Sequence, residues 1–129
     1  MKKAELIKTS NTIVAIVIRA KTKIDNVEFF TPSENPLQMA VHDYVKKRVT
    51  NIHKPSLRKP VLIKEFHKFL FITKGTVVVH LINNKNVIFS KKRLSTGDCM
   101  IMMNTFHKVV FSKNSHAIEV KQGPYESDV

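Results

Sequence analysis

The stretch Lys68-Phe69-Leu70-Phe71-Ile72-Thr73-Lys74-Gly75 decides the fold of this chain. Its aromatic and β-branched residues are typical of a β-strand, and the glycine at its end is typical of a turn. The next run, Thr76–Ile82, is again rich in β-branched residues, so the two runs are expected to form a hairpin. Asn83–Asn86 supplies the following turn, because asparagine adopts a left-handed backbone at low cost.

Similar short runs, separated by turn residues, continue on both sides of this stretch. No segment shows a helical period, and the regular spacing of the runs favours an all-β, antiparallel sandwich or barrel. Residues 51–60 are expected to form a loop and residues 94–98 a turn. The expected strands span residues 12–19, 27–30, 37–45, 64–73, 76–82, 87–91, 99–103, 107–112 and 117–122.

The length and composition fit one globular domain. The chain has 129 residues, of which 43% are hydrophobic, so a single domain over residues 1–129 is expected, with its core at about 12–125. The one cysteine, Cys99, excludes an intramolecular disulfide and suits a reducing compartment. No apolar run reaches the ~20 residues that span a bilayer, and the N-terminus reads as neither signal peptide nor anchor. The expectation is a soluble, cytoplasmic protein without a membrane partner.

The charge is strongly one-sided. Lys and Arg number 22 and Asp and Glu 10, which gives a net charge of +12 and a pI of about 10.0. Such a balance favours anionic partners, namely nucleic acid, a phosphate-bearing small molecule or an acidic surface. The excess is mostly lysine in a chain rich in Asn and Ile, so base composition of the genome is an equally good explanation.

Two histidine motifs carry a resemblance to a known family. Asn51-Ile52-His53 lies upstream of the opening stretch, and Gly97-Asp98 followed by His107 lies downstream. With these motifs the chain resembles the cupins, and more narrowly the small single-domain bacterial cupins, from about Ile13 to Tyr125. The further matching stretches are Glu28–Pro32, Pro36–Gln38, His53–Pro55 with Arg58, and the closing Ile118-Glu119-Val120-Lys121-Gln122-Gly123-Pro124-Tyr125.

The resemblance implies a fold and a metal site. The fold is a double-stranded β-helix, also called a jelly-roll barrel, and its metal is held by a histidine pair, a carboxylate and a second-motif histidine. Here Asn51 stands in place of the first histidine and Lys68 in place of the carboxylate. A cation repels a divalent metal, so only His53 and His107 fit as ligands. The site is therefore degenerate, and the cofactor is expected to be none or a single Zn, Fe, Mn or Ni ion.

His67 offers a way to rebuild the site with a third imidazole. Neighbouring residues of a strand point to opposite faces, however, so His67 points outward if Lys68 points inward. A bulge or a slip of one residue would reverse this.

Other residues suit the binding of an anionic ligand. Lys68 in the carboxylate position would hold a phosphate or carboxylate, the alternative being a lysine that extends to the barrel rim. Arg58 would bind a phosphate bidentately, the alternative being a solvated loop arginine. The same mouth would include Gln38 and Asn51, and Glu119 with Lys121, which share a strand face and are more simply structural.

Histidines and a tyrosine suggest proton transfer. Gln38, His42 and Tyr44 are expected on one face of a strand, where a histidine–tyrosine pair could act as general acid and base. His53 and His107 would join them as catalytic residues, in isomerase or epimerase chemistry. The alternative is a polar edge strand. Cys99 follows Gly97-Asp98 in an apolar run and is interpreted as a core residue.

The function expected first is a small-molecule-binding cupin that acts on or senses a sugar or nucleotide-sugar derivative in bacterial surface-polysaccharide metabolism. Whether it is an enzyme stays open. One alternative is a metal-dependent cupin isomerase, epimerase or oxygenase with a rebuilt histidine site. Another is a basic nucleic-acid-binding or regulatory module, which the scattered charge and few aromatics make the less favoured partner class. A homodimer is expected, with Phe69 and Phe71 suited to its interface.

Overall fold

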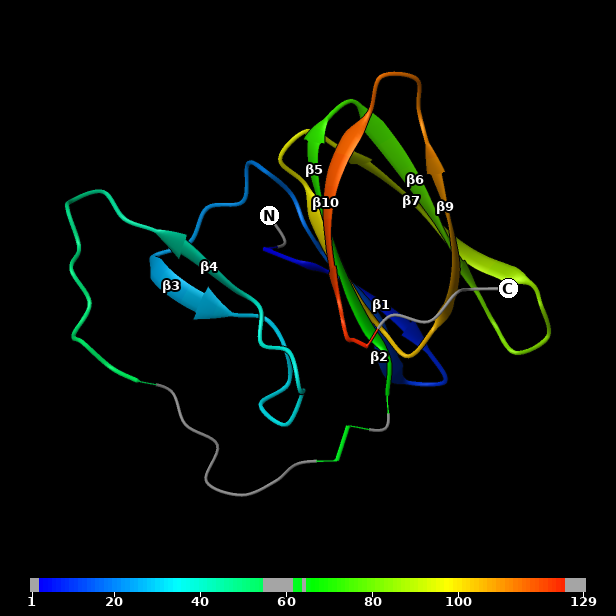
Figure 1. The fold of residues 1–129 in the computed structure, drawn as a ribbon, viewed down its shortest axis with the longest axis horizontal. Helices are drawn as coiled ribbons and strands as arrows, with labels where there is room; N and C mark the ends of the chain where they lie inside the picture. Colours follow the sequence, from blue (N-terminus) through cyan, green and yellow to red (C-terminus); the bar gives the residue numbers. More distant parts are fainter. Residues whose placement is uncertain (1–2, 55–61, 64, 125–129) are drawn as a thin grey trace. The chain divides into compact units, whose positions relative to one another are not determined.

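The computed structural model describes residues 3–54, 62–63 and 65–124, which form two compact units. The first unit contains residues 1–22 and 65–129, and the second contains residues 23–64. The described chain is all-β and all its strand pairs are antiparallel, as the sequence predicts (Figure 1). Within these residues no helix is long and apolar enough to cross a membrane.

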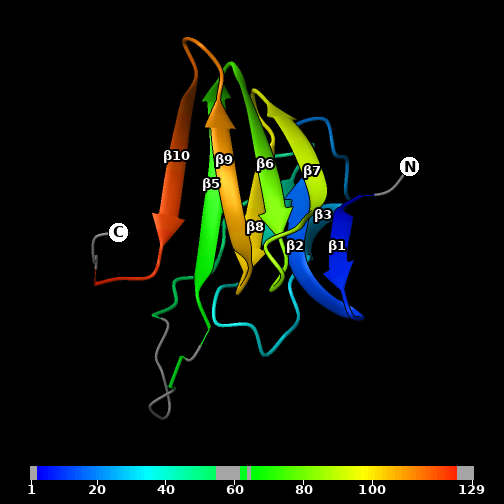
Figure 2. The same ribbon diagram turned by 90° about the vertical axis from the view of Figure 1, so that its right-hand side faces the viewer.

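The first unit consists of two sheets. One is five-stranded, with the order β1-β2-β8-β5-β10, and the other is three-stranded, with the order β7-β6-β9 (Figure 2). Strands β10 and β9 therefore lie at the edges of their sheets. The strands are β1 (Glu5–Thr9), β2 (Thr12–Ile18), β5 (His67–Lys74), β6 (Thr76–Ile82), β7 (Ile88–Ser95), β8 (Cys99–Met103), β9 (Phe106–Phe111) and β10 (His116–Lys121).

The second unit contains one strand pair, β3 (Asn26–Phe29) with β4 (Ala40–Asp43). The strand expected over residues 37–45 is shorter than predicted, because Gln38 is occupied in a turn. Its side-chain oxygen accepts from the Thr31 hydroxyl at 3.0 Å, and its amide nitrogen donates to the carbonyls of Pro32 at 2.9 Å and Asn35 at 2.8 Å. A side chain that satisfies local backbone groups in this way favours a turn over a strand.

Most of the other strand predictions agree with the structure. The bounds of β6 and β8 are those expected, whereas β7 continues to Ser95 through the first half of the expected turn. Strand β1 was not predicted, because its sequence Glu-Leu-Ile-Lys-Thr carries two charges in five residues.

The prediction that β5 and β6 form a hairpin is wrong. Strand β5 pairs with β8 and β10, and β6 pairs with β7 and β9, so the two strands belong to different sheets. Near the turn at Gly75 the hydrogen-bonding groups of both strands are already used. Ile72 exchanges backbone hydrogen bonds with Gly97 and Asp98, and Thr76 accepts one from Ser112. The short connection thus changes sheets instead of forming a ladder.

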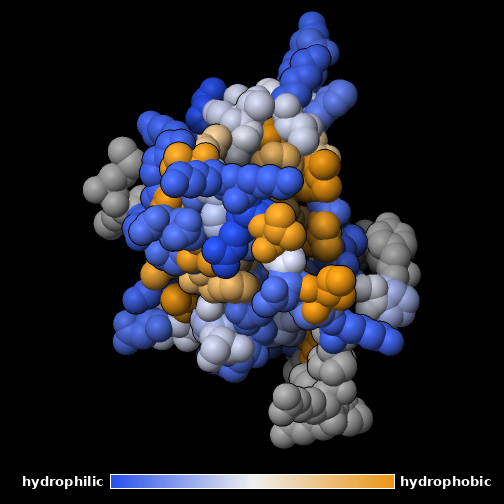
Figure 3. Space-filling view, turned by 90° about the vertical axis from the view of Figure 1, so that its left-hand side faces the viewer, coloured by the Kyte–Doolittle hydropathy of each residue, from blue (hydrophilic) through white to orange (hydrophobic). Residues whose placement is uncertain are grey.

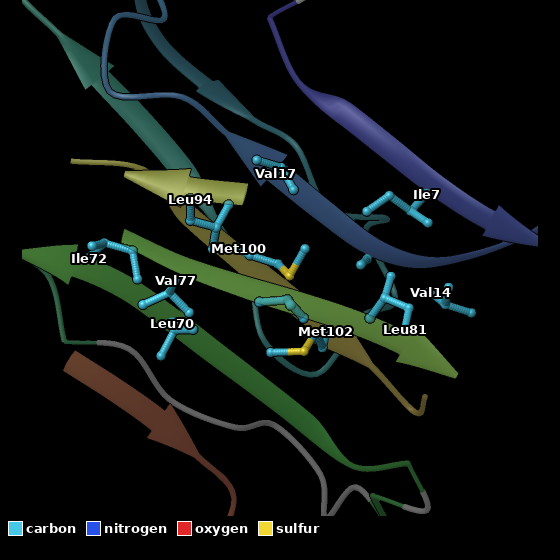
Figure 4. Packing of buried hydrophobic residues seen from close by; sticks show 12 residues of the cluster. Ile7, Val14, Val17, Leu70, Ile72, Val77, Leu81, Leu94, Met100 and Met102 are labelled. Atoms are coloured by element: carbon cyan, nitrogen blue, oxygen red, sulfur yellow. The ribbon is translucent and has the colours of Figure 1, made fainter. Parts of the chain in front are cut away.

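The core lies between the two sheets of the first unit. Alternate residues of each strand point inward, among them Leu70 and Ile72 of β5 and Val77, Val79 and Leu81 of β6, all nearly inaccessible to solvent. Figure 4 shows the labelled side chains of β5 and β6 directed toward those of β2 and β8, namely Leu70, Ile72, Val77 and Leu81 toward Val14, Val17, Met100 and Met102. On the face seen in Figure 3, hydrophobic side chains reach the surface as separate patches among hydrophilic ones.

A charged network closes one end of the inner face. The Asp98 carboxylate accepts hydrogen bonds from the backbone N–H of Ala20 at 2.9 Å and of Ser95 at 2.8 Å, and from the Arg19 guanidinium at 3.1 Å. The same guanidinium binds the Glu5 carboxylate at 2.6 and 3.1 Å, and Lys92 lies 3.3 Å from Glu5. The network therefore joins β1, the end of β2, β7 and the turn before β8.

The electrostatics of this network favour ionised carboxylates. Burial alone would raise the pKa of Asp98, but the hydrogen bonds from Ser95 and Ala20 and the charge of Arg19 outweigh it and hold the pKa below its ordinary value. The hydrogen bond from Arg19 likewise lowers the pKa of Glu5.

Gly97 makes this turn possible in two ways. Its φ of +89° is one that residues with a Cβ rarely adopt, and a Cβ at this position would lie 2.6 Å from that of Ala20. Its N–H donates to the Ile72 carbonyl at 2.7 Å, so the close approach also fixes the turn against β5.

We expect Gly97→Ala to lower the free energy of unfolding by about 2–4 kcal/mol, because it adds both backbone strain and a clash. Adding Ala20→Gly removes the clash and leaves about 1–2 kcal/mol from the positive φ. Urea unfolding of the two single variants and the double variant measures the coupling. Equal stability of Gly97→Ala and the wild type would contradict this account of the turn.

Acid should weaken the Asp98 contacts. Because the pKa of the folded carboxyl is lowered, its contribution is complete above the unfolded value of about 3.9 and is lost as the pH falls below it. We expect Asp98→Asn to cost about 2–4 kcal/mol at neutral pH, and the difference from wild type to shrink below about pH 4. Chemical unfolding from pH 7 to 3 measures this, with the exposed Glu34→Gln as control. A difference that does not change with pH would exclude this role of the ionised carboxylate.

Candidate functional site

Lys68 places an ammonium group on the inner face of the five-stranded sheet. It alternates in phase with Leu70 and Ile72, which are buried in the core. Its cross-strand partners are Met102 of β8 and Lys121 of β10. Only 13% of its side chain is exposed, and its Nζ lies 3.1 Å from Oε1 of Glu119. The lysine in the expected carboxylate position is therefore inward-facing and paired.

Glu119 and Lys121 complete a group of three charges, here called the Lys68 cluster. Both residues are on β10, two positions apart and so on one face, with Lys121 Nζ 3.9 Å from Glu119 Oε2. The intervening Val120 and the preceding Ile118 point to the other face and are about half exposed. A single carboxylate thus lies beside two ammonium groups, and it is the more exposed partner, at 41%.

His107 comes from the other sheet and also points inward. It pairs with Leu81 on β6, a fully buried core residue. Its Nδ1 lies 3.1 Å from the Thr105 carbonyl, which can only accept, so Nδ1 carries the proton in this contact. The backbone N–H of Asn104 donates to the Phe66 carbonyl at 2.6 Å, which ties the start of β9 to the start of β5. His107 therefore lies at the end of the unit where the Lys68 cluster lies.

The two ends of the inner face differ in charge balance. At the Asp98 end, two carboxylates contact two cations, Arg19 and Lys92. At the other end, the ion pairs among the described residues join two cations, Lys68 and Lys121, to Glu119, and His107 adds an imidazole ring. The first arrangement suits a structural closure, and the second suits the attraction of an anion.

His67 does not join this group. It is fully buried but lies on the face opposite to Lys68, and the register of β5 with β8 is regular from His67 to Phe71, without a bulge. Its backbone N–H donates to the Gln122 side chain at 2.8 Å, and its Nδ1 lies 3.3 Å from the Glu65 carbonyl.

The second unit brings His42 and Tyr44 together. The His42 Nδ1 lies 2.9 Å from the Tyr44 hydroxyl, and Arg48 lies 5.8 Å from the centre of the Tyr44 ring. Gln38 does not join them, because its amide is used in the turn described above. The pairing needed for proton transfer is present, on an exposed surface of the unit.

Asn51 and His53 also belong to the second unit and are exposed. The His53 Nδ1 lies 3.0 Å from the backbone carbonyl of Asn51, so this contact does not use the Asn51 side chain. Arg58 lies outside the described residues. Within residues 3–54, 62–63 and 65–124, no three His, Cys, Asp or Glu side chains gather in a way that could hold a metal ion. His53 and His107, the two expected ligands, come from different units.

Cys99 has the character of a core residue. Burial, with a contribution from the nearby Asp98 charge, raises the pKa of its thiol to about 11, although a backbone hydrogen bond involving Ile18 lowers it in part. The thiol is therefore protonated at neutral pH and is a poor nucleophile.

Sequence reasoning missed the Glu5–Arg19 pair, because β1 was not expected and a single carboxylate near the N-terminus carries no spacing signal.

Comparison of the chain with protein-family models, curated proteins and solved structures gives no significant match.

We expect Lys68→Met to change the free energy of unfolding by less than about 1 kcal/mol. The carboxylate of its partner Glu119 is exposed, so the ion pair contributes little, and an apolar side chain suits the core face. Leu70→Ala, two residues further on the same face, should cost about 2–5 kcal/mol. Thermal and urea unfolding measure both. A cost for Lys68→Met as large as that for Leu70→Ala would mean that the lysine is retained for stability.

Proposed function

We propose that this chain is a cupin that binds a small anionic ligand, such as a sugar phosphate or nucleotide-sugar, through the Lys68 cluster. The observation that carries the proposal is an inward-facing lysine on the core face of a two-sheet unit, paired to a carboxylate that is far more exposed than itself.

The winding of the strands supports the double-stranded β-helix. The β6–β7 hairpin lies in one sheet, and the strands before and after it, β5 and β8, pair with each other in the other sheet. Strands β9 and β10 then add to β6 and β5, again in alternate sheets. An antiparallel ribbon coiled in this way is the basis of jelly rolls. The complete pattern needs further strands beyond β9 and β10, whereas β3 and β4 pair with each other.

The chemistry of the cluster favours exchange of one anion for another. An incoming phosphate can take the place of the Glu119 carboxylate at Lys68 Nζ, where a charge-assisted hydrogen bond is strong because the ammonium is largely shielded from water. His107 at the same end could donate or accept a proton once a ligand is bound. This is the role in which a sugar-modifying activity would use it.

The test is calorimetric titration with UDP-glucose and dTDP-glucose, with neutral glucose and inorganic phosphate as comparison ligands. We expect Lys68→Met to weaken binding by about 10- to 150-fold, since a hydrogen bond to a charged group is lost. Glu119→Gln should instead strengthen binding, because the competing carboxylate is removed. Weakening by both substitutions, or no binding of either nucleotide-sugar, would refute the proposal.

Elemental analysis of the protein purified without an affinity tag separates this proposal from the metal-dependent alternative. We expect the affinity for the nucleotide-sugars, measured by calorimetric titration, to be unchanged by prior treatment with a chelator. About one Zn, Fe, Mn or Ni ion per chain, with binding lost on chelation, would favour the metal-dependent enzyme.

A further inference from the structure

The outer face of the three-stranded sheet carries charge of one sign. Residues 76–96 and 104–118, all of them described, contain no Asp or Glu. Within them, β6 places Val77, Val79 and Leu81 in the core, so Val78 and His80 lie on the outer face. This face is independent of the Lys68 cluster, which lies on the inner side of the other sheet.

Three cations lie on this outer face around His80. In the register of the sheet, His80 has Lys91 of β7 on one side and Lys108 of β9 on the other. Arg93 lies opposite Val78, two positions along β7 from Lys91. All three cations are exposed. Strand geometry separates Lys91 from Lys108 by about 10 Å and from Arg93 by about 7 Å.

A hydrophobic row with one aromatic residue, Phe106, borders the cations. Phe106 of β9 and Ile88 of β7 flank Ile82 on the same face, and the Phe106 side chain is 66% exposed. Ile88 is 43% exposed, so Phe106 presents the larger apolar surface. Figure 2 looks onto the strands β9, β6 and β7 that carry these residues.

We propose that the outer face of β7-β6-β9 binds single-stranded nucleic acid, with phosphates on Lys91, Arg93 and Lys108 and a base stacked on Phe106. Cations that follow the backbone, together with an exposed aromatic ring on which a base can stack, are the features that such binding requires. A sheet without carboxylates adds no repulsion to a polyanion.

The experiment measures fluorescence anisotropy of a labelled oligo-dT and oligo-U of about 16 nucleotides, between about 50 and 200 mM salt. The double variant Lys91→Gln/Lys108→Gln is compared with Lys46→Gln/Lys47→Gln, which removes the same charge from exposed residues of the second unit. We expect the first pair to reduce the slope of log K against log salt by about 1.4, and the second to leave it unchanged.

Phe106→Ala should weaken binding by about 5- to 150-fold at unchanged salt slope, because it removes stacking and no charge. Lys68→Met should leave oligonucleotide binding unchanged, which separates this face from the proposed ligand site. Circular dichroism checks that each variant is folded.

Several results would overturn the inference. These are no oligonucleotide binding by the wild type, an equal loss in the two lysine pairs, or no effect of Phe106→Ala. Equally tight binding of poly-glutamate would assign the face to acidic chains in general, and equally tight binding of phosphatidylserine vesicles would assign it to membranes. Either would exclude the stacked nucleic acid.

Discussion

The Asp98 carboxylate connects three segments of the first unit through hydrogen bonds to Arg19, Ala20 and Ser95. It accepts hydrogen bonds from the backbone N–H groups of Ala20 and Ser95, two segments far apart in sequence. The backbone carbonyl of Asp98 accepts a further hydrogen bond from the Ile72 N–H. Without it, the end of β2, the end of β7 and the start of β8 would have no shared acceptor. The hydrogen bond from Ala20 to Asp98 brings Ala20 so close to the turn that a side chain at position 97 would clash with it. The contact of the carboxylate therefore requires glycine at position 97.

The two-residue period of β-strands explains why one surface serves both folding and chemistry. The alternation that places Leu70 and Ile72 in the core also places Lys68 on the inner face of the sheet. Lys68 lies near the start of β5, at the end of the sheet where polar residues replace the core. The Lys68 ammonium lies there beside the better exposed carboxylate of Glu119. If Lys68→Met leaves the stability unchanged, as we expect, the lysine at this position is a good candidate for function.

Local patterns in the sequence were enough to predict the all-β class and the bounds of β6 and β8, where a run rich in apolar residues ends at an asparagine. They could not predict that β5 and β6 belong to different sheets, because pairing depends on hydrogen-bond partners some 25 residues away at Gly97 and Asp98. The same limit applies to the site. The alternation of Lys68 with Leu70 is a local property, whereas the link from Asn104 to Phe66, which brings His107 to the same end, is not.

The distribution of charge bears on whether a net charge of +12 reflects function or composition. Drift toward lysine would place cations wherever the surface tolerates them, but would not remove carboxylates from one sheet while leaving them elsewhere. Here Glu5 and Asp98 neutralise the cations at one end of the core, and Glu119 partly neutralises those at the other. The outer face of β7-β6-β9 has no such compensation. This uneven compensation, more than the total charge, supports the proposal that the positive charge on that face is directed at a partner.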